Sequence, residues 1–204
     1  MPIAGNWNGN GADEIGVYRP ASSTFYLRHA NGGYSSFAFG NRGDVPIIGN
    51  WNGTGADEIG VYRPGNRSFY LRLPDGSVID TPPHGNRGDV PVIGDWFGDG
   101  WDRIGVYRPA NRTFYRGGRE PITFGNPGDK PISINWDAST VEHEIGVYRP
   151  GSSTFYLRYA SGTTRAFAFG NRGDVPFIGD WDNDGGDDLG VYRPGNRTFY
   201  FGGI

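Results

Sequence analysis

Cysteine is absent from the 204 residues, and Lys130 is the only lysine among the 19 basic residues. The lack of cysteine excludes disulfides, thiol catalysis and zinc sites built on thiolates, but it is compatible with either side of a cell membrane. The other basic residues are arginines that form no run, and the formal net charge is −3. We therefore expect no basic surface for phosphates and no nucleic-acid partner.

Long apolar stretches are missing as well. No segment approaches the roughly 20 consecutive apolar residues of a membrane-spanning helix. The opening residues MPIAGNWNGN carry neither the basic nor the apolar region of a signal peptide. We expect a soluble chain that does not insert into a membrane.

Glycine and aromatic residues dominate what is present. The chain has 36 Gly and 15 Pro, and 15% of its residues are aromatic. Disordered segments contain few aromatic residues, so glycine and proline at this level indicate turns between short aromatic strands. The composition predicts an all-β fold.

One short motif recurs five times. It reads IGVYRP at 15–20, 59–64, 104–109 and 145–150, and LGVYRP at 189–194. Each copy follows a polar loop and a strand that ends near Trp, and each precedes a TFY or SFY strand. Another strand, such as SSFAFG at 35–40, usually comes next. The unit is therefore a sheet of short antiparallel strands.

Four strands in about 40–50 residues are typical of a propeller blade, because such a sheet buries both faces only when neighbours stack on it. We predict one domain over 1–204, a five-bladed β-propeller with units of approximately 1–44, 45–89, 90–129, 130–174 and 175–204. A β-solenoid is the alternative, but its coils are usually shorter than this unit.

The outer strand of the unit is visible only four times, near 35–39, 77–81, 121–124 and 166–169. Three interpretations follow: a ring whose last blade has three strands, a ring completed by another chain, or a part of a longer array. An unpaired strand edge invites association. We favour the first interpretation and a monomer, with strand completion by a second chain as the alternative.

The segment FGNRGDVPFIGDWDNDGGDDLGVYRP at 169–194 resembles the FG-GAP repeat of integrin-type β-propellers and of bacterial FG-GAP-like proteins. The resemblance covers nearly the whole chain, although the IGVYRP strand does not copy the family's GAP segment. The resemblance implies a bacterial interaction module that is extracellular or on the cell surface and serves as an accessory domain of a larger protein.

The polar loop of the fifth unit places Asp180, Asp182, Asp184 and Asp188 at its positions 1, 3, 5 and 9. Ca²⁺ takes about six to eight oxygen ligands, and alternate residues of a tight loop can turn their carboxylates inward. In FG-GAP propellers this loop binds Ca²⁺. We predict one structural Ca²⁺ here, with a metal-free acidic turn as the alternative.

The other four loops have lost parts of this pattern. Two have one carboxylate each and are expected to hydrogen-bond to their own backbone: Asn6, Asn8, Asn10 and Glu14 in the first, and Asn50, Asn52, Thr54 and Glu58 in the second. In the third, Phe97 and Arg103 stand among Asp95 and Asp99, so the guanidinium is expected to replace the ion. The fourth, with Asn135, Asp137, Ser139 and Glu144, is out of register.

The tripeptide RGD occurs at 42–44, 87–89 and 172–174, and its fourth counterpart reads PGD at 127–129. Integrins recognise RGD, but its position at each corner between units favours a turn. Each unit also ends its YRP strand in an arginine. We expect these arginines to pair with the corner aspartates.

Trp7, Trp51, Trp96, Trp136 and Trp181 occupy one repeated position, which indicates packing between blades. Propeller lectins bind sugars on such rings in clefts between blades, so a multivalent lectin is an alternative to a protein-binding module. Trp101 lies outside the repeat and is a better candidate for an exposed contact.

Residues outside the repeat fit no catalytic spacing: His29, His84, His143, Glu120, Glu142 and Lys130. Because catalysis needs an asymmetric set of groups in one place, we expect a binding module for a protein or glycan that is not an enzyme. A propeller enzyme is the third alternative.

Overall fold

Short strands alternate with glycine-rich turns along the chain in the computed structural model, which describes residues 1–136 and 142–202. The first blade consists of β1 (Pro2–Gly5), β2 (Glu14–Arg19), β3 (Thr24–Arg28) and β4 (Tyr34–Ala38). The second consists of β5 (Val45–Gly49), β6 (Glu58–Arg63), β7 (Ser68–Arg72) and β8 (Val78–Asp80). The third consists of β9 (Val90–Gly94), β10 (Arg103–Arg108), β11 (Thr113–Arg116) and β12 (Ile122–Thr123).

The fourth blade consists of β13 (Lys130–Ile134), β14 (Glu144–Arg149), β15 (Thr154–Arg158) and β16 (Thr164–Ala168). The fifth has three strands, β17 (Val175–Gly179), β18 (Asp188–Arg193) and β19 (Thr198–Gly202). Within each blade the strands pair antiparallel in chain order. The predicted five-bladed propeller with a three-stranded last blade is thus confirmed.

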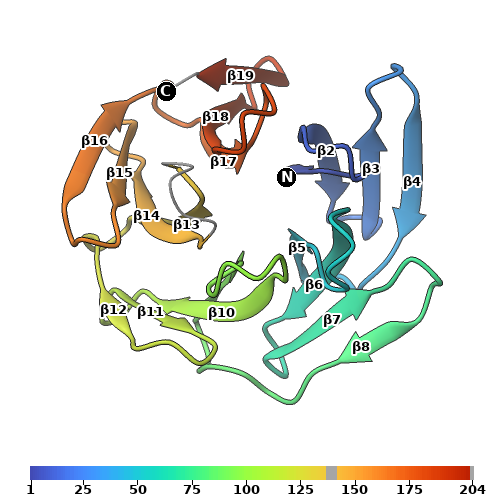
Figure 1. Cartoon of the computed structure of the whole chain (residues 1–204), viewed down its shortest axis with the longest axis horizontal. Coiled ribbons are helices and arrows are strands. Elements are labelled where there is room, and N and C mark those ends of the chain that lie inside the picture. Colours follow the sequence, from blue (N-terminus) through green and yellow to red (C-terminus); the bar gives the residue numbers. More distant parts are fainter. Residues whose placement is uncertain (137–141, 203–204) are drawn as a thin grey trace.

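The five blades are arranged around a central axis (Figure 1). Their innermost strands contact one another in the order β1, β5, β9, β13 and β17, and β17 contacts β1 again. The ring therefore closes at its inner rim, between the first and the last blade. Among the described residues no helix is present, and so none that is long and apolar enough to cross a membrane.

The glycine of the IGVYRP motif is required by packing inside the blade. A Cβ on Gly16 would lie 2.8 Å from the carbonyl oxygen of Tyr26 on the next strand, and a Cβ on Gly60 would lie 3.0 Å from that of Tyr70. Real side chains avoid such contacts, so only glycine lets these strands approach. The motif is therefore recurrent for a steric reason.

Aromatic and β-branched residues fill the interfaces between blades. The tyrosine of the motif lies against the phenylalanine of the following strand, as in Tyr62 and Phe69, whose ring centroids are 4.8 Å apart. Both are buried, and Val106 of the next blade packs on them. Equivalent clusters join blades 1 and 2, 3 and 4, and 4 and 5.

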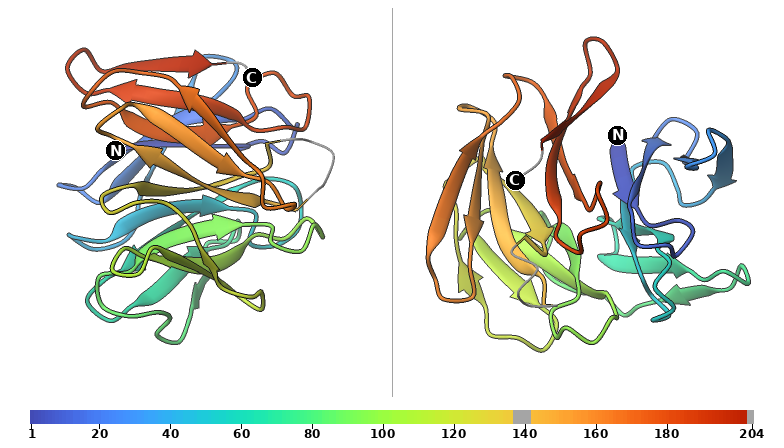
Figure 2. Two further views of the ribbon diagram at one scale, coloured as in Figure 1. Left: turned by 90° about the vertical axis from the view of Figure 1, so that its left-hand side faces the viewer. Right: turned by 45° about the horizontal axis from the view of Figure 1, so that its top comes forward.

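The interface between blades 5 and 1, which we call the seam, is packed less tightly than the other four. Val17 on β2 is half-buried, whereas its counterparts Val61, Val106, Val147 and Val191 are at most 1% exposed. Phe199 on β19 is also half-buried. Figure 2 shows the first and last blades facing each other across this interface. The seam therefore differs from the other four interfaces in leaving these equivalent residues partly exposed.

Candidate functional site

The fifth polar loop brings three of the four predicted metal ligands together. Carboxylate oxygens of Asp180, Asp182 and Asp184 lie within 4.8 Å of one another. Asp180 accepts hydrogen bonds from the N–H groups of Asn183 and Gly185, at 2.7 and 3.0 Å. These bonds hold the loop in its turn and leave lone pairs on the carboxylates.

Asp188 begins β18, opposite Gly179, and is not part of this group of three. Three converging carboxylates provide three to six oxygens, which suits the hard ligand set of Ca²⁺. The loop therefore fits a calcium ion through Asp180, Asp182 and Asp184, and the role of Asp188 stays a prediction.

Arg103 occupies the third loop as the sequence predicts. Its guanidinium donates to both carboxylate oxygens of Asp99, at 2.8 and 2.6 Å, and lies 3.6 Å from Asp95. These hydrogen bonds lower the pKa of Asp99 to about 2. The arginine thus supplies the positive charge of this loop.

The first two loops are held by their own hydrogen bonds. Asn8 donates to Glu14 at 2.5 Å, and the N–H of Asn10 donates to the side chains of Asn6 and Asn8. The second loop repeats the arrangement, with Asn52 donating to Glu58 at 2.5 Å. In the fourth loop, Asp137 and Ser139 lie outside the described residues.

The corner aspartates are structural. Asp44 is 5% exposed and accepts two hydrogen bonds from Arg63, at 3.0 and 2.9 Å. The same bidentate pairs join Arg108 to Asp89, Arg149 to Asp129, and Arg193 to Asp174. The aspartate of every RGD is therefore buried and engaged in the folded chain, so the tripeptide does not present its carboxylate to a receptor.

Four of the five repeated tryptophans pack on a glycine two residues earlier, and Ile134 takes this place before Trp136. A Cβ on Gly49 would lie 2.7 Å from the ring of Trp51, and a Cβ on Gly179 would lie 2.6 Å from the ring of Trp181. Trp96 is only 1% exposed. Trp101, in contrast, is 48% exposed and lies over Gly53 of the neighbouring loop.

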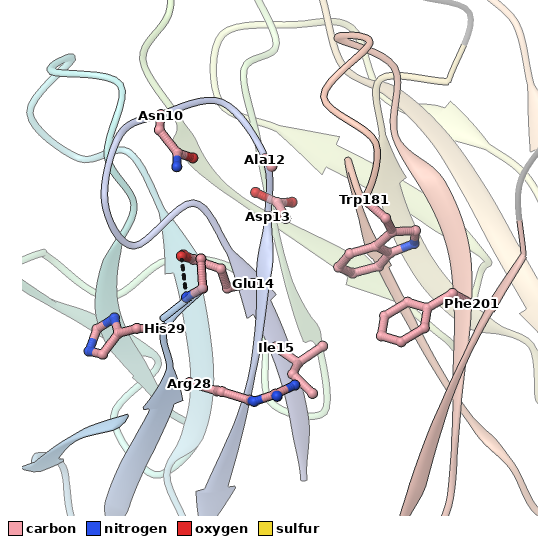
Figure 3. Close-up of a pocket in the computed structure, with 10 residues that line it drawn as sticks. Asn10, Ala12, Asp13, Glu14, Ile15, Arg28, His29, Trp181 and Phe201 are labelled. Carbon is pink, nitrogen blue, oxygen red and sulfur yellow. Dashed lines mark hydrogen bonds between the residues drawn. The ribbon is translucent and has the colours of Figure 1, made fainter. Parts of the chain in front are cut away.

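A cavity lies in the seam, and we call it the seam cleft (Figure 3). It encloses about 440 Å³. Trp181 and Phe201 of blade 5 form one wall, with ring centroids 5.1 Å apart. Phe201 is 51% exposed because β19, on which it stands, is the outermost strand of its blade.

Blade 1 supplies the polar wall of the seam cleft: Asn10, Asp13, Glu14, Arg28 and His29. Glu14 is fixed by the N–H of Trp7 at 3.1 Å and of Ala30 at 3.3 Å. His29 contacts the hydroxyl of Ser35 through Nε2 at 2.7 Å. In the seam cleft, two aromatic rings therefore face a set of hydrogen-bonding groups.

Two related clefts lie between other blades. The cleft between blades 1 and 2 encloses about 340 Å³ and contains Trp7, Phe37 and Arg72. The cleft between blades 3 and 4 encloses about 180 Å³ and is more polar, with Arg116, Arg119 and Glu142. The seam cleft is larger than the first of these, in which Ser35 and Phe37 of an outer strand provide an additional wall.

A ring of polar residues surrounds the central channel, where a cavity of about 120 Å³ is lined by Asp13, Asp57, Asp102, Asp187, His143 and Ser133 among others. Each aspartate forms a pair of hydrogen bonds with the backbone of the neighbouring blade, and we call this pair a clasp. Asp57, for example, accepts from the N–H of Asn6 at 2.8 Å and donates its own N–H to the carbonyl of Asn6 at 2.8 Å. His143 takes the place of the fifth aspartate.

Burial raises the pKa values of these channel carboxyls. Burial, followed by the charges of Asp57 and Asp187, raises the pKa of Asp13 to about 9. Burial, followed by the charge of Asp102, raises the pKa of Asp57 to about 8. The pKa values of Asp102 and Asp187 are also raised, chiefly by burial. Neutral carboxyls therefore predominate at Asp13 and Asp57 at pH 7.

This ring of channel residues was not predicted from the sequence. Its four aspartates stand one residue before the ninth position of their polar loops, whereas the metal-ligand pattern drew attention to positions 1, 3, 5 and 9. The recurrence of Asp in four units was the available signal, and His143 takes this place in the fourth unit, whose loop is displaced by one residue. His143 thus belongs to a repeated position after all.

No family model matches the chain, and no similar sequence is found among curated proteins. Solved structures with a similar fold include an inactive virginiamycin B lyase from Staphylococcus aureus with quinupristin, at 12% identity and TM-score 0.48, over 92% of this chain and 65% of the lyase. A streptogramin B lyase has 11% identity and TM-score 0.49, over 94% and 65%. BBS1N in complex with ARL6DN has 12% identity and TM-score 0.44, over 98% and 66%.

These similarities concern the fold alone, and the chain spans about two thirds of the length of the lyases. The β-propeller itself is established by the five sheets and the closed ring of inner strands, while no family model supports the FG-GAP type. The prediction that the chain is not an enzyme is wrong, because lyases are among these neighbours. Repetition of polar positions does not exclude catalysis on a propeller.

Proposed function

We propose that the chain is a binding module that holds a glycan in the clefts between its blades, with the seam cleft as the main site. The observation that carries the proposal is the pairing of Trp181 and Phe201 with a polar wall across a cavity of about 440 Å³. Pockets for small ligands are typically about 300–1,000 Å³, apolar on most of their surface and supplied with a few placed polar groups.

The chemistry of the seam cleft suits a pyranose ring. The C–H faces of a sugar are apolar and stack on aromatic rings, which carry a large contact area at low conformational cost. Its hydroxyls need donors and acceptors, which Arg28, His29 and Asn10 offer from the opposite blade. Figure 3 shows Trp181 and Phe201 on one side and these polar residues on the other.

The calcium ion proposed for the fifth loop would serve this site. Asp180 and Asp182 flank Trp181 in the sequence, so fixing their carboxylates also fixes the base of one cleft wall. Weak loops of this kind are filled at the high calcium concentrations outside cells. Placement of the module at the cell surface or outside the cell follows as part of the proposal.

A glycan array followed by calorimetric titration of the best ligand tests the function. Phe201→Ala should weaken binding about tenfold, since it removes an exposed stacking face. Phe97→Ala is the matched control, because Phe97 is 40% exposed but lies outside the cleft. Mass analysis of the recovered glycan distinguishes binding from turnover.

Absence of binding to every glycan, together with capture of a protein ligand that depends on Phe201, would replace the glycan by a protein partner. Equal effects of Phe201→Ala and Phe97→Ala would remove the seam cleft as the site.

A further inference from the structure

Four segments of the chain connect one blade to the next, and each forms the outer strand of its blade before it contacts the next blade. The segment at 164–174, TRAFAFGNRGD, provides β16, which pairs with β15 so that Phe167 lies opposite Phe155. Phe169 then packs on the core between blades 4 and 5. We call these four stretches corner segments.

Each corner segment also completes the next blade at two points. Its glycine lies on a valine: a Cβ on Gly170 would lie 3.0 Å from Val191. Its aspartate accepts the bidentate bond of an arginine, as Asp174 does from Arg193 at 2.9 Å. These hydrogen bonds lower the pKa of Asp174. A corner segment is therefore recognised by a strand edge, an apolar surface and a guanidinium.

The seam has all the receiving groups but, among the described residues, no corner segment. The outer edge of β19 pairs with no strand of the described chain. Val17, which stands where Val191 stands, is half-buried rather than covered. Phe199, the counterpart of Phe155, is half-buried as well.

Arg19 completes the pattern. Its four counterparts are partly buried and each holds a corner aspartate, whereas Arg19 is exposed. Its guanidinium lies 4.2 Å from the centre of the Tyr26 ring and donates to the Tyr26 hydroxyl at 3.3 Å. No carboxylate of the described residues pairs with it. The stacking on tyrosine is the same as in the paired copies, for example Arg63 on Tyr70 at 4.2 Å, so the guanidinium is already positioned.

We propose that the seam binds, as a strand added to β19, an extended segment of another polypeptide with the chemistry of the corner segments at 35–44 and 164–174: two alternating phenylalanines, then Gly-Asn-x-Gly-Asp. Addition of a strand to an exposed edge supplies main-chain hydrogen bonds, and pockets for alternate side chains supply specificity. Each of the four corner segments is engaged where its own blade meets the next one, so the occupant of the seam lies outside these 204 residues.

The added strand would form a new wall of the seam cleft rather than block it. In the cleft between blades 1 and 2, Ser35 and Phe37 of the outer strand β4 hold this position. The added strand would lie beside Phe201, so the proposal is tested apart from glycan binding through Arg19, which does not line the seam cleft.

The test uses the labelled peptide TRAFAFGNRGD and the full chain. Fluorescence anisotropy should show saturable binding with one peptide per chain, and the peptide should raise the melting temperature of the chain. A peptide with Asn in place of its final Asp should bind at least about tenfold more weakly, because the ion pair with Arg19 is lost. A scrambled peptide should not bind.

Chain variants identify the contact. Arg19→Met should weaken the wild-type peptide about as much as the Asn peptide is weakened, and combining the two changes should cause no further loss. Arg42→Met is the matched control, since Arg42 is exposed at a corner and has no part in the seam. Glycan binding should persist in Arg19→Met.

Absence of peptide binding would overturn the proposal, as would binding that is indifferent to both the final Asp and Arg19. Sedimentation of the chain alone tests the other candidate occupant of the seam, a second copy of this chain. A dimer that forms through the seam and is not displaced by the peptide would overturn the proposal in favour of a second copy.

Discussion

Asp13 on the first blade clasps Asp180 on the last. The carboxyl of Asp13 accepts a hydrogen bond from the N–H of Asp180 at 3.1 Å, and the N–H of Asp13 donates to the carbonyl of Asp180 at 2.7 Å. The same pair of bonds joins Asp57 to Asn6 and Asp102 to Asn50. The ring thus closes at the channel by a repeated clasp between blades, although the last blade lacks an outer strand.

Loss of the clasp should weaken the whole ring. Asp13→Ala leaves the N–H of Asp180 without its side-chain acceptor and should lower the free energy of unfolding by about 1–3 kcal/mol. Asp13→Asn keeps an acceptor oxygen and should cost less. Urea denaturation of both variants measures the difference. Equal losses in the two would show that the carboxyl makes no essential hydrogen bond.

The channel carboxyls should make stability depend on pH. The pKa of Asp57 is about 8 in the folded chain against an ordinary value of 3.8. A raised pKa means that the folded state holds a proton that the unfolded state releases, so its contribution is complete below pH 4 and is lost as the pH rises through 8. The free energy of unfolding should therefore fall between about pH 4 and pH 8.

Asp57→Asn should flatten this dependence, whereas Asp80→Asn, at an exposed position of β8, should leave it unchanged. Denaturation midpoints measured at intervals from pH 4 to pH 9 provide the comparison. A midpoint that rises with pH across this range in the wild type, or an equal slope in Asp57→Asn, would contradict the assignment.

The fifth loop should bind Ca²⁺ structurally. Millimolar Ca²⁺ should raise the melting temperature relative to EDTA, and Asp184→Ala should abolish the difference, because it removes one of three converging carboxylates. Terbium gives a second signal, since Trp181 stands between Asp180 and Asp182 and can sensitise its emission. Asp75→Ala, at an exposed turn, serves as the control. Identical melting curves with Ca²⁺ and EDTA would count against the site.

Removing an arginine that pairs with a corner aspartate should lower the free energy of unfolding more than removing Arg19, which has no such pair among the described residues. Arg63→Met leaves the buried carboxylate of Asp44 without its bidentate donor and should cost about 1–3 kcal/mol. Arg19→Met, at the same position of blade 1, should cost less than about 0.5 kcal/mol, because Arg19 holds no carboxylate among the described residues. Thermal melts of the two variants make the comparison, and equal losses would show that the ion pair does not determine the cost.

Much of the fold could be predicted from the sequence because the same unit occurs five times. The IGVYRP strand and its glycine are fixed by contacts within one blade, and each corner aspartate pairs with the arginine of the next blade. Both kinds of contact recur along the chain. Arg103 could be predicted as the counter-charge of its loop because Asp95 and Asp99 lie close by in sequence.

The seam cleft and the channel could not be predicted in this way. Asp13 and Glu14 are adjacent, yet Asp13 lines the channel and Glu14 holds the backbone of Trp7. Which of the two faces the channel depends on how five blades meet, and no single unit contains that information. The exposure of Phe201 likewise depends on a strand that its blade lacks.

The most direct test of ligand binding in the seam cleft is a ¹H–¹⁵N NMR titration that follows the indole N–H signals of the six tryptophans. Adding the best glycan should shift the signal of Trp181 first and leave that of Trp101 unmoved, since Trp181 forms a wall of the cleft and Trp101 lies outside it. Shifts confined to Trp101, or saturation of binding without a change at Trp181, would contradict the account.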